Sequence, residues 1–160
     1  IVGKTGTMCD FIQDSDFIVA IGDAGMRKAI MEVLIAAGAS LATLIHPSAV
    51  IGSKVTIGEG TVVMPGAVIN VESVIGKGCI INTASSVDHN CVLGDYVHVA
   101  VGAHLCGMVT IHDMTWIGAG ATIINGVHLC ADCMIGAGAV VTKNIKEKGT
   151  YIGVPARRTI

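Results

Sequence analysis

Residues 69–104 read INVESV IGKGCI INTASS VDHNCV LGDYVH VAVGAH, six consecutive hexads that each begin with Ile, Val or Leu. The same frame continues without an insertion from Ile45 to Lys146, which makes seventeen hexads. An uninterrupted short repeat predicts a solenoid, in which similar coils stack and bury one continuous core.

Three positions of the hexad indicate how such a coil is built. The first position is aliphatic in every hexad, and the fifth is small in every hexad but the last, where it is Ile145. A large side chain followed four residues later by a small one suits a narrow, close-packed interior. The second position is rich in Gly, Asn and Asp, which tolerate the left-handed backbone region, so we expect it to form tight corners between short strands.

The composition agrees with regular layers and excludes some partners. Apolar residues make up 52% of the 160 residues but aromatic residues only 3%, so Ile, Val, Leu and Ala have to fill the core. The net charge is −2 and no basic stripe is present, which argues against nucleic acid as a partner. No apolar stretch reaches the roughly 18 residues of a membrane span, and no signal peptide is visible.

Residues 1–44 have a different pattern. The apolar run from Phe17 to Ile21 predicts a short strand that ends at Gly22, and Asp23 is a suitable helix N-cap. Helical spacing on one face follows at Met26, Ile30, Val33 and Leu34, with Arg27, Lys28 and Glu32 on other faces. The helix should end near Gly38, and Leu41 to Ile45 predicts a strand.

The chain therefore divides into three parts. Residues 1–44 are expected to be the C-terminal part of a truncated α/β domain, since the chain begins at Ile1 without methionine. Residues 45–146 form the solenoid, and residues 147–160 form an end segment.

Six cysteines raise the possibility of a metal site or of disulfides. Cys79, Cys91 and Cys133 occupy the small fifth position, where core thiols are expected. Cys130 and Cys133 form one Cys-x-x-Cys pair, but no second pair completes a zinc set. We therefore expect reduced thiols, no metal and a cytoplasmic protein.

The hexad pattern resembles the hexapeptide-repeat left-handed β-helix family, in which three hexads make one triangular coil. That resemblance implies a left-handed parallel β-helix of five to six coils, with Gly107 stacked on His89 and open space over the imidazole. A histidine can take up a proton near neutral pH, which makes His89 a candidate base. His98 lies half a coil further on, so within one subunit it should stand on a different edge.

Four segments narrow the resemblance: NTASSVDH at 82–89, GDYVHV at 94–99, GVPAR at 153–157 and IVAIGD at 18–23. The first three are similar to the sugar O- and N-acyltransferases of the sialic acid O-acetyltransferase and UDP-4-amino-sugar N-acetyltransferase type. The fourth resembles the end of the α/β domain that holds the nucleotide-sugar in that family.

This resemblance implies an acetyl-CoA-dependent acetyltransferase that acts directly on an amino or hydroxyl group of a sugar, a nucleotide-sugar or sialic acid, as a homotrimer. The site residues it implies are the general base His89, the base-modulating position Asn90, the acetyl-CoA contacts His98, Gly107, Ala119 and Ala137, and the substrate contact Gly22. The amino-sugar enzymes typically have a glutamate where this chain has Asn90. Because an amide supplies no charge, O-acetylation stays open, and Asp88 is an alternative source of charge.

Other functions share this fold. A γ-class carbonic anhydrase builds a zinc site from three histidines between subunits, and His89, His98 and His104 could be recruited for one. Two ligands in that family are five residues apart, however, whereas His98 and His104 are six apart. A serine or simple-sugar O-acetyltransferase is the nearest rival among transferases. A non-catalytic β-helix would display flat ranks of Thr, which this sequence lacks.

Overall fold

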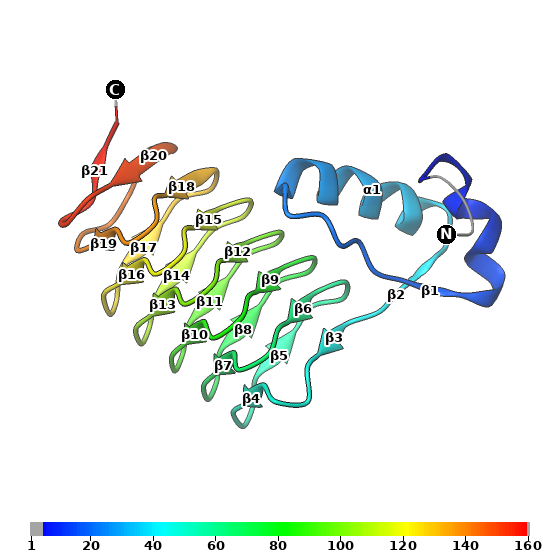
Figure 1. Ribbon diagram of the computed structural model, residues 1–160, viewed down its shortest axis with the longest axis horizontal. Coiled ribbons are helices and arrows are strands. Elements are labelled where there is room, and N and C mark those ends of the chain that lie inside the picture. Colours follow the sequence, from blue (N-terminus) through cyan, green and yellow to red (C-terminus); the bar gives the residue numbers. More distant parts are fainter. Residues whose placement is uncertain (1–4, 160) are drawn as a thin grey trace.

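The computed structural model describes residues 5–159, so the predicted truncation at Ile1 lies outside the described residues. Its main body is a parallel β-solenoid with three faces, and the N-terminal segment lies beside the first coils (Figure 1). Strands pair in parallel with the strands one coil above and below, for example Val87 with Leu105 and with Ile69. The predicted stacked parallel solenoid is confirmed.

The faces are three sheets, here named I, II and III. Sheet I consists of β4 (Val50–Ile51), β7 (Val68–Ile69), β10 (Ser86–Val87), β13 (His104–Leu105), β16 (Thr122–Ile123) and β19 (Val140–Val141). Sheet II consists of β5 (Thr56–Ile57), β8 (Val74–Ile75), β11 (Val92–Leu93), β14 (Thr110–Ile111) and β17 (His128–Leu129). Sheet III consists of β3 (Leu44–Ile45), β6 (Val62–Val63), β9 (Ile80–Ile81), β12 (His98–Val99), β15 (Trp116–Ile117), β18 (Cys133–Ile135), β20 (Gly149–Ile152) and β21 (Arg157–Arg158).

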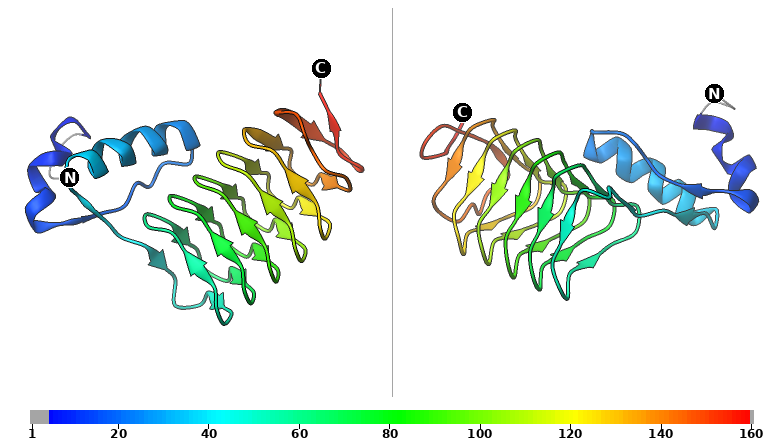
Figure 2. Two further views of the ribbon diagram at one scale, coloured as in Figure 1. Left: turned by 180° about the vertical axis from the view of Figure 1, so that it is seen from behind. Right: turned by 60° about the horizontal axis from the view of Figure 1, so that its bottom comes forward.

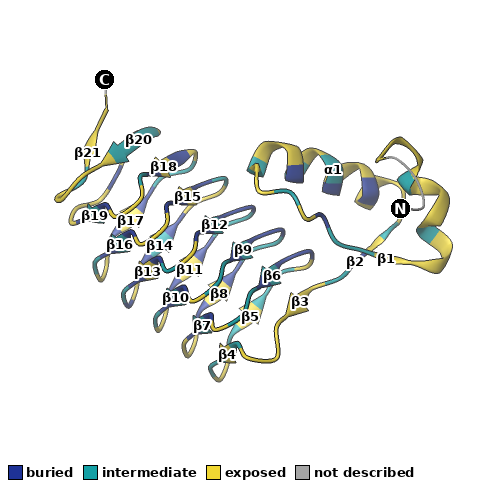
Figure 3. Ribbon diagram, in the orientation of Figure 1, coloured by how far each residue is buried: buried dark blue, intermediate teal, exposed yellow. Residues whose placement is uncertain are grey.

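The interior is filled as the hexad predicts. From β6 onward, buried residues recur regularly along the coils (Figure 3). The first position supplies the aliphatic layers, such as Ile81 and Ile117, and the fifth supplies small side chains such as Ala103, all of them fully buried. Ile45, in the first coil, is exposed, because no coil lies beneath it to cover its side chain. One continuous core therefore runs along the solenoid axis.

The corners differ from the prediction. Left-handed backbone angles occur at the fourth position of the hexad and not at the second, as at Gly66 (φ 68°), Ala84 (φ 53°) and Gly102 (φ 63°). Glycine at the second position has a different cause, which is close approach of the next coil. A Cβ on Gly118 would lie 2.5 Å from the carbonyl oxygen of Ile135 in that coil. Second-position glycines thus set the spacing between coils.

The N-terminal segment contains η1 (Thr5–Asp14), β1 (Asp16–Phe17), α1 (Ala24–Ala36) and β2 (Ser40–Leu41). β1 and β2 pair in parallel and α1 connects them. Asp23 is the N-cap of α1 as predicted, since its carboxylate accepts a hydrogen bond of 2.8 Å from the Met26 N–H. The helix ends before Gly38, which has a φ of 85°.

The two predicted strands of this segment are shorter than expected. The first covers only Asp16 and Phe17, because the chain then turns toward Gly22. The run from Leu41 to Ile45 divides between β2 and β3, since its hydrogen bonds change partners. The Ala42 N–H donates to Phe17, whereas the Leu44 N–H donates to Thr61 in the next coil.

The buried face of α1 also differs from the prediction. Arg27, Met31 and Leu34 are buried, whereas Met26 and Val33 are about half exposed. Met31 packs on the corner between sheets II and III, where a Cβ on Gly78 would lie 2.9 Å from its sulfur. The helix thus lies along that corner in both views of Figure 2.

Two expectations from composition concern membranes and thiols. Within residues 5–159, helices are too short and too polar to cross a bilayer. All six cysteines are free thiols, and Cys79, Cys91 and Cys133 are buried, as predicted for core positions. Burial raises the pKa of Cys79 to about 12, so this thiol stays protonated and unreactive at neutral pH.

Candidate active site

His89 lies at the corner between sheets I and II, directly after β10. Its side chain is exposed, and its Nδ1 lies 2.9 Å from Oδ1 of Asn90. Asn90 has the left-handed backbone (φ 57°) that an asparagine tolerates well. The neighbouring amide therefore holds the imidazole by one nitrogen and leaves the other, Nε2, for chemistry.

Asp88 holds the backbone of this corner and not the imidazole. Its Oδ1 accepts hydrogen bonds from the His89 N–H (2.8 Å) and from Nδ2 of Asn70 (2.9 Å). The hydrogen bond from Asn70 and, to a smaller extent, the one from the His89 N–H hold the pKa of Asp88 below its usual range. The Asp88 carboxylate therefore bonds to the backbone of His89 and to Asn70, while its negative charge also interacts weakly with the His89 imidazole.

Gly107 stacks above His89 as expected, but the predicted open space over the His89 imidazole is absent, because the ring itself fills the space beside Gly107. A Cβ on Gly107 would lie 2.5 Å from Nε2 and 2.7 Å from Cε1 of His89. The imidazole therefore occupies the place that a Gly107 side chain would take. Among the described residues, none accepts a hydrogen bond from the Gly107 N–H, which leaves a backbone donor beside the imidazole.

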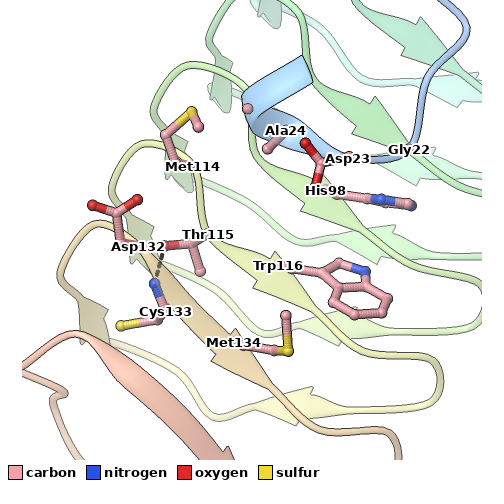
Figure 4. A pocket seen from close by; sticks show the side chains of 11 residues that line it. Gly22, Asp23, Ala24, His98, Met114, Thr115, Trp116, Asp132, Cys133 and Met134 are labelled. Atoms are coloured by element: carbon pink, nitrogen blue, oxygen red, sulfur yellow. Dashed lines mark hydrogen bonds between the residues drawn. The ribbon is translucent and has the colours of Figure 1, made fainter. Parts of the chain in front are cut away.

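A pocket of about 580 Å³ opens on a different side of the solenoid (Figure 4). It is lined by residues 22–25 at the start of α1, and by His98, residues 114–116 and residues 132–134 on sheet III and its corner. The lining is mainly apolar, with Trp116 and Met134 side by side in Figure 4. This size and lining are typical of a site for a small organic ligand.

His98 is one of several titratable residues that line the pocket, together with Asp23, Asp132 and Cys133. Its Nε2 lies 3.2 Å from Nδ2 of Asn82, and its ring lies 6.0 Å from the Trp116 ring between centroids. Burial and the nearby Arg27 guanidinium lower the pKa of His98, although a hydrogen bond with the Gly22 backbone opposes them. The His98 imidazole is therefore neutral at pH 7, a form that can both donate and accept a hydrogen bond.

The structure brings some of the site residues expected from the sequence together and separates others. His98 and Gly22 line the same pocket. His89 and Gly107 lie at the corner between sheets I and II, whereas Ala119 and Ala137 lie exposed at the corner after β15 and β18. Within one chain, the candidate base and these alanines therefore occupy different edges.

Arg27 holds the loop at Gly22, on one side of the pocket, in place. The helical periodicity of the sequence did not predict this role. Its side chain is 1% exposed, and its guanidinium donates to four carbonyl oxygens, on Gly78, Ile21, Gly22 and Tyr96, at 2.7 to 2.9 Å. Two of these carbonyls belong to the loop before α1 and two to the solenoid. Arg27 thus ties the loop to the coils.

Replacing Arg27 with Ala should lower the free energy of unfolding by about 3 kcal/mol, because buried carbonyls lose a charged donor. The Gly22 loop should separate from the solenoid, while the repeat itself stays folded. Chemical denaturation with separate probes for the N-terminal segment and the solenoid measures both. The exposed Arg157→Ala is the matched control, and equal stability of the two variants would contradict this role.

Within one chain, the three histidines that the zinc alternative would recruit do not lie together. His104 Nδ1 lies 2.8 Å from the Ser86 hydroxyl on sheet I, His98 lies on sheet III, and His89 lies on a corner. Residues 5–159 of one chain contain no group of three or more His, Cys, Asp or Glu side chains placed to hold a metal ion.

Comparisons with known proteins show the family to which the chain belongs. Residues 108–143 match the model of the bacterial transferase hexapeptide (six repeats). Perosamine N-acetyltransferase from Caulobacter crescentus, solved in complex with CoA and GDP-perosamine, is 38% identical, with a TM-score of 0.96 over 99% of this chain and 77% of that one. The chain belongs to the hexapeptide-repeat sugar acyltransferases.

Two further relatives are similar. The acetyltransferase domain of PglB from Neisseria gonorrhoeae, in complex with acetyl coenzyme A, is 37% identical, with a TM-score of 0.95 over 99% of this chain and 78% of that one. UDP-N-acetylbacillosamine N-acetyltransferase from Bacillus subtilis is 43% identical over 51 residues, which span 32% of this chain and only 24% of that relative. Membership of this family confirms the β-helix expected from the hexads.

Proposed function

We propose that the protein transfers the acetyl group of acetyl-CoA to the amino group of a nucleotide-linked sugar, with His89 as general base. The observation that carries the proposal is the placement of His89, whose Nδ1 is held by Asn90 and whose Nε2 lies against a glycine with a free N–H. The likeness to the perosamine enzyme supports an amine acceptor over sialic acid or another hydroxyl acceptor.

Each group has a definite role in this reaction. The sugar amine attacks the thioester carbonyl while Nε2 of His89 takes a proton from the nitrogen. The Gly107 N–H donates to the oxygen that becomes negative. The C–S bond then breaks, an amide remains on the sugar, and the proton on His89 passes to the CoA thiolate. No acyl-enzyme is needed, because the thioester is already activated.

The acceptor and acetyl-CoA are assigned to different parts of the pocket and of the edge beside it. The pocket at His98 has the Gly22 loop and α1 on one wall, and we assign the acceptor to that loop and an end of acetyl-CoA to His98. The backbone at Ala119 and Ala137 is exposed on the adjoining edge, and their small side chains leave room for the pantetheine arm. The unit formed by β1, α1 and β2 thus serves as part of the nucleotide-sugar domain.

A homotrimer completes the site. His89 and Ala119 lie on different edges of one solenoid, so both can contact one acetyl-CoA only if neighbouring subunits pack edge to edge. Apolar side chains at exposed positions, among them Val50, Val74 and Val92 at 43 to 58% exposure, offer surface for such packing.

An assay of CoA thiol release against a panel of acceptors tests the proposal. UDP-linked 4-amino sugars and GDP-perosamine should stimulate release and yield an amide, whereas sialic acid should not. Release with sialic acid alone, giving an ester, would contradict the amine assignment and leave an O-acetyltransferase. Mass spectrometry and alkaline lability distinguish the amide from the ester.

A further inference from the structure

A column of side chains lies along the corner that carries His89. Lys54, Glu72, Asn90 and Met108 follow one another at the fourth position in successive coils, with φ values of 57 to 61°. The corner after sheet III has glycine at most of the corresponding positions, such as Gly66 and Gly102. Non-glycine residues in this backbone region cost about 1 kcal/mol each. The corner between sheets II and III also has side chains at these positions, on Tyr96, Met114 and Asp132, so it is the contacts of the column at His89 that distinguish it.

Three of these side chains form a continuous chain of hydrogen bonds to the imidazole. Nζ of Lys54 donates to Oε1 of Glu72 at 2.9 Å. Oε2 of Glu72 accepts from Nδ2 of Asn90 at 3.0 Å, and Oδ1 of Asn90 lies 2.9 Å from Nδ1 of His89. The carboxylate therefore lies one coil below the base and contacts it only through the amide.

Elementary chemistry fixes the direction of each bond. An ionised carboxylate can only accept, so the atom of Asn90 that faces Glu72 has to be the NH₂ group. The hydrogen bond from Lys54 and, to a smaller extent, the one from Asn90 lower the pKa of Glu72. The lowered pKa keeps this carboxylate ionised. The carbonyl oxygen of Asn90 must then face His89, and an oxygen there requires a proton on Nδ1.

We propose that Glu72 is a positioning residue for the reaction, which orients the Asn90 amide so that His89 carries its proton on Nδ1 and keeps the lone pair on Nε2. The inference rests on the proposed role of His89 as base. Glu72 thus replaces a carboxylate that would contact the histidine directly. It lies in the neighbouring coil and acts on His89 by fixing the orientation of the Asn90 amide.

The tautomer of His89 gives the most direct test, because it can be read without turnover. Nitrogen-15 NMR of the histidine side chains, with His89 assigned by its loss in His89→Ala, should show a proton on Nδ1 in the wild type. In Glu72→Ala the amide can rotate, so the two nitrogen shifts should move toward each other as the tautomers mix. Glu59→Ala removes an exposed carboxylate from another corner and should leave the shifts unchanged.

Kinetics should follow the tautomer. Glu72→Ala should lower kcat about tenfold, a part of the 10²- to 10⁴-fold that a general base contributes, with the KM for acetyl-CoA unchanged. Glu72→Gln keeps an acceptor for Asn90, so its kcat should lie between those of the wild type and Glu72→Ala. In the double variant Glu72→Ala/Asn90→Glu the new carboxylate contacts Nδ1 directly and should restore kcat.

An unchanged His89 tautomer in Glu72→Ala would overturn the proposal, whatever happens to kcat. A loss of kcat that Asn90→Glu does not restore would also overturn it, since it would mean a general structural defect. If every sugar acceptor fails with the wild type, the proposed function fails, while the NMR result still decides whether Glu72 sets the tautomer.

Discussion

Replacing His89 with Ala is expected to lower kcat for acetyl transfer by about 10²- to 10⁴-fold, the usual contribution of a general base. The imidazole is exposed and its bonds to Asn90 are local, so the fold should not change. Binding of CoA, measured by calorimetry, should stay within about threefold of the wild type, because the contacts proposed for CoA are at His98, Ala119 and Ala137 and do not include the His89 ring.

A second histidine serves as the matched control. His46 is exposed in the first coil, where its Nδ1 lies 2.8 Å from the Ser48 hydroxyl, and His46→Ala should retain full activity. Full activity of His89→Ala would contradict the role of His89 as base, and equal losses in both variants would indicate that histidine removal harms the solenoid generally.

Replacing Gly107 with Ala is expected to produce the second large loss, about 100-fold in kcat, because a displacement of roughly 1 Å is enough for such an effect. The new Cβ would lie 2.5 Å from Nε2 of His89, so the ring has to rotate away from the reacting position. Stability should change little, since the displaced group is an exposed side chain and not backbone.

The control for this variant lies one coil further on. Asn125 occupies the same corner position above Gly107 and is exposed, so Asn125→Ala should keep both kcat and stability. Circular dichroism and a thermal melt show whether Gly107→Ala is folded. A folded Gly107→Ala with wild-type kcat would mean that the His89 orientation against Gly107 is not the reactive one.

The sequence predicted the solenoid well because its hexads encode a periodic core, which local pattern alone can reveal. It predicted the corners less well, because glycine has two possible causes. Gly118 avoids a clash with the next coil, whereas Gly102 adopts a positive φ, and composition does not separate these cases.

The candidate site was predicted in part. His89, and the position of Gly107 above it, follow from the repeat once a coil of 18 residues is assumed. The same spacing places Glu72 beneath Asn90, so this partner could have been found from the sequence. Arg27 could not, because helical periodicity treats a charged residue as outward-facing, and only tertiary carbonyls make its burial favourable.

The pocket at His98 also lay beyond sequence reasoning. It forms because α1 packs along the corner between sheets II and III, which brings Gly22 against β12. That packing depends on Met31 and Tyr96, residues whose hexad and helix positions give no sign of contact. The packing of one element on another depends on how well their surfaces fit, and those surfaces are formed by residues that are far apart in the sequence.

Complementation between inactive subunits tests the central claim most directly: that acetyl transfer occurs at a site shared by His89 of one subunit and the Ala119 edge of the next. His89→Ala and Ala119→Trp, each inactive alone and each checked for trimer formation, are co-expressed with different tags and co-purified. Co-purification on both tags keeps only mixed trimers, and in each of these about a third of the interfaces join an intact His89 to an intact Ala119 edge. Recovery of about a third of wild-type acetyl transfer is the predicted result, and trimers containing both chains that remain inactive would contradict it.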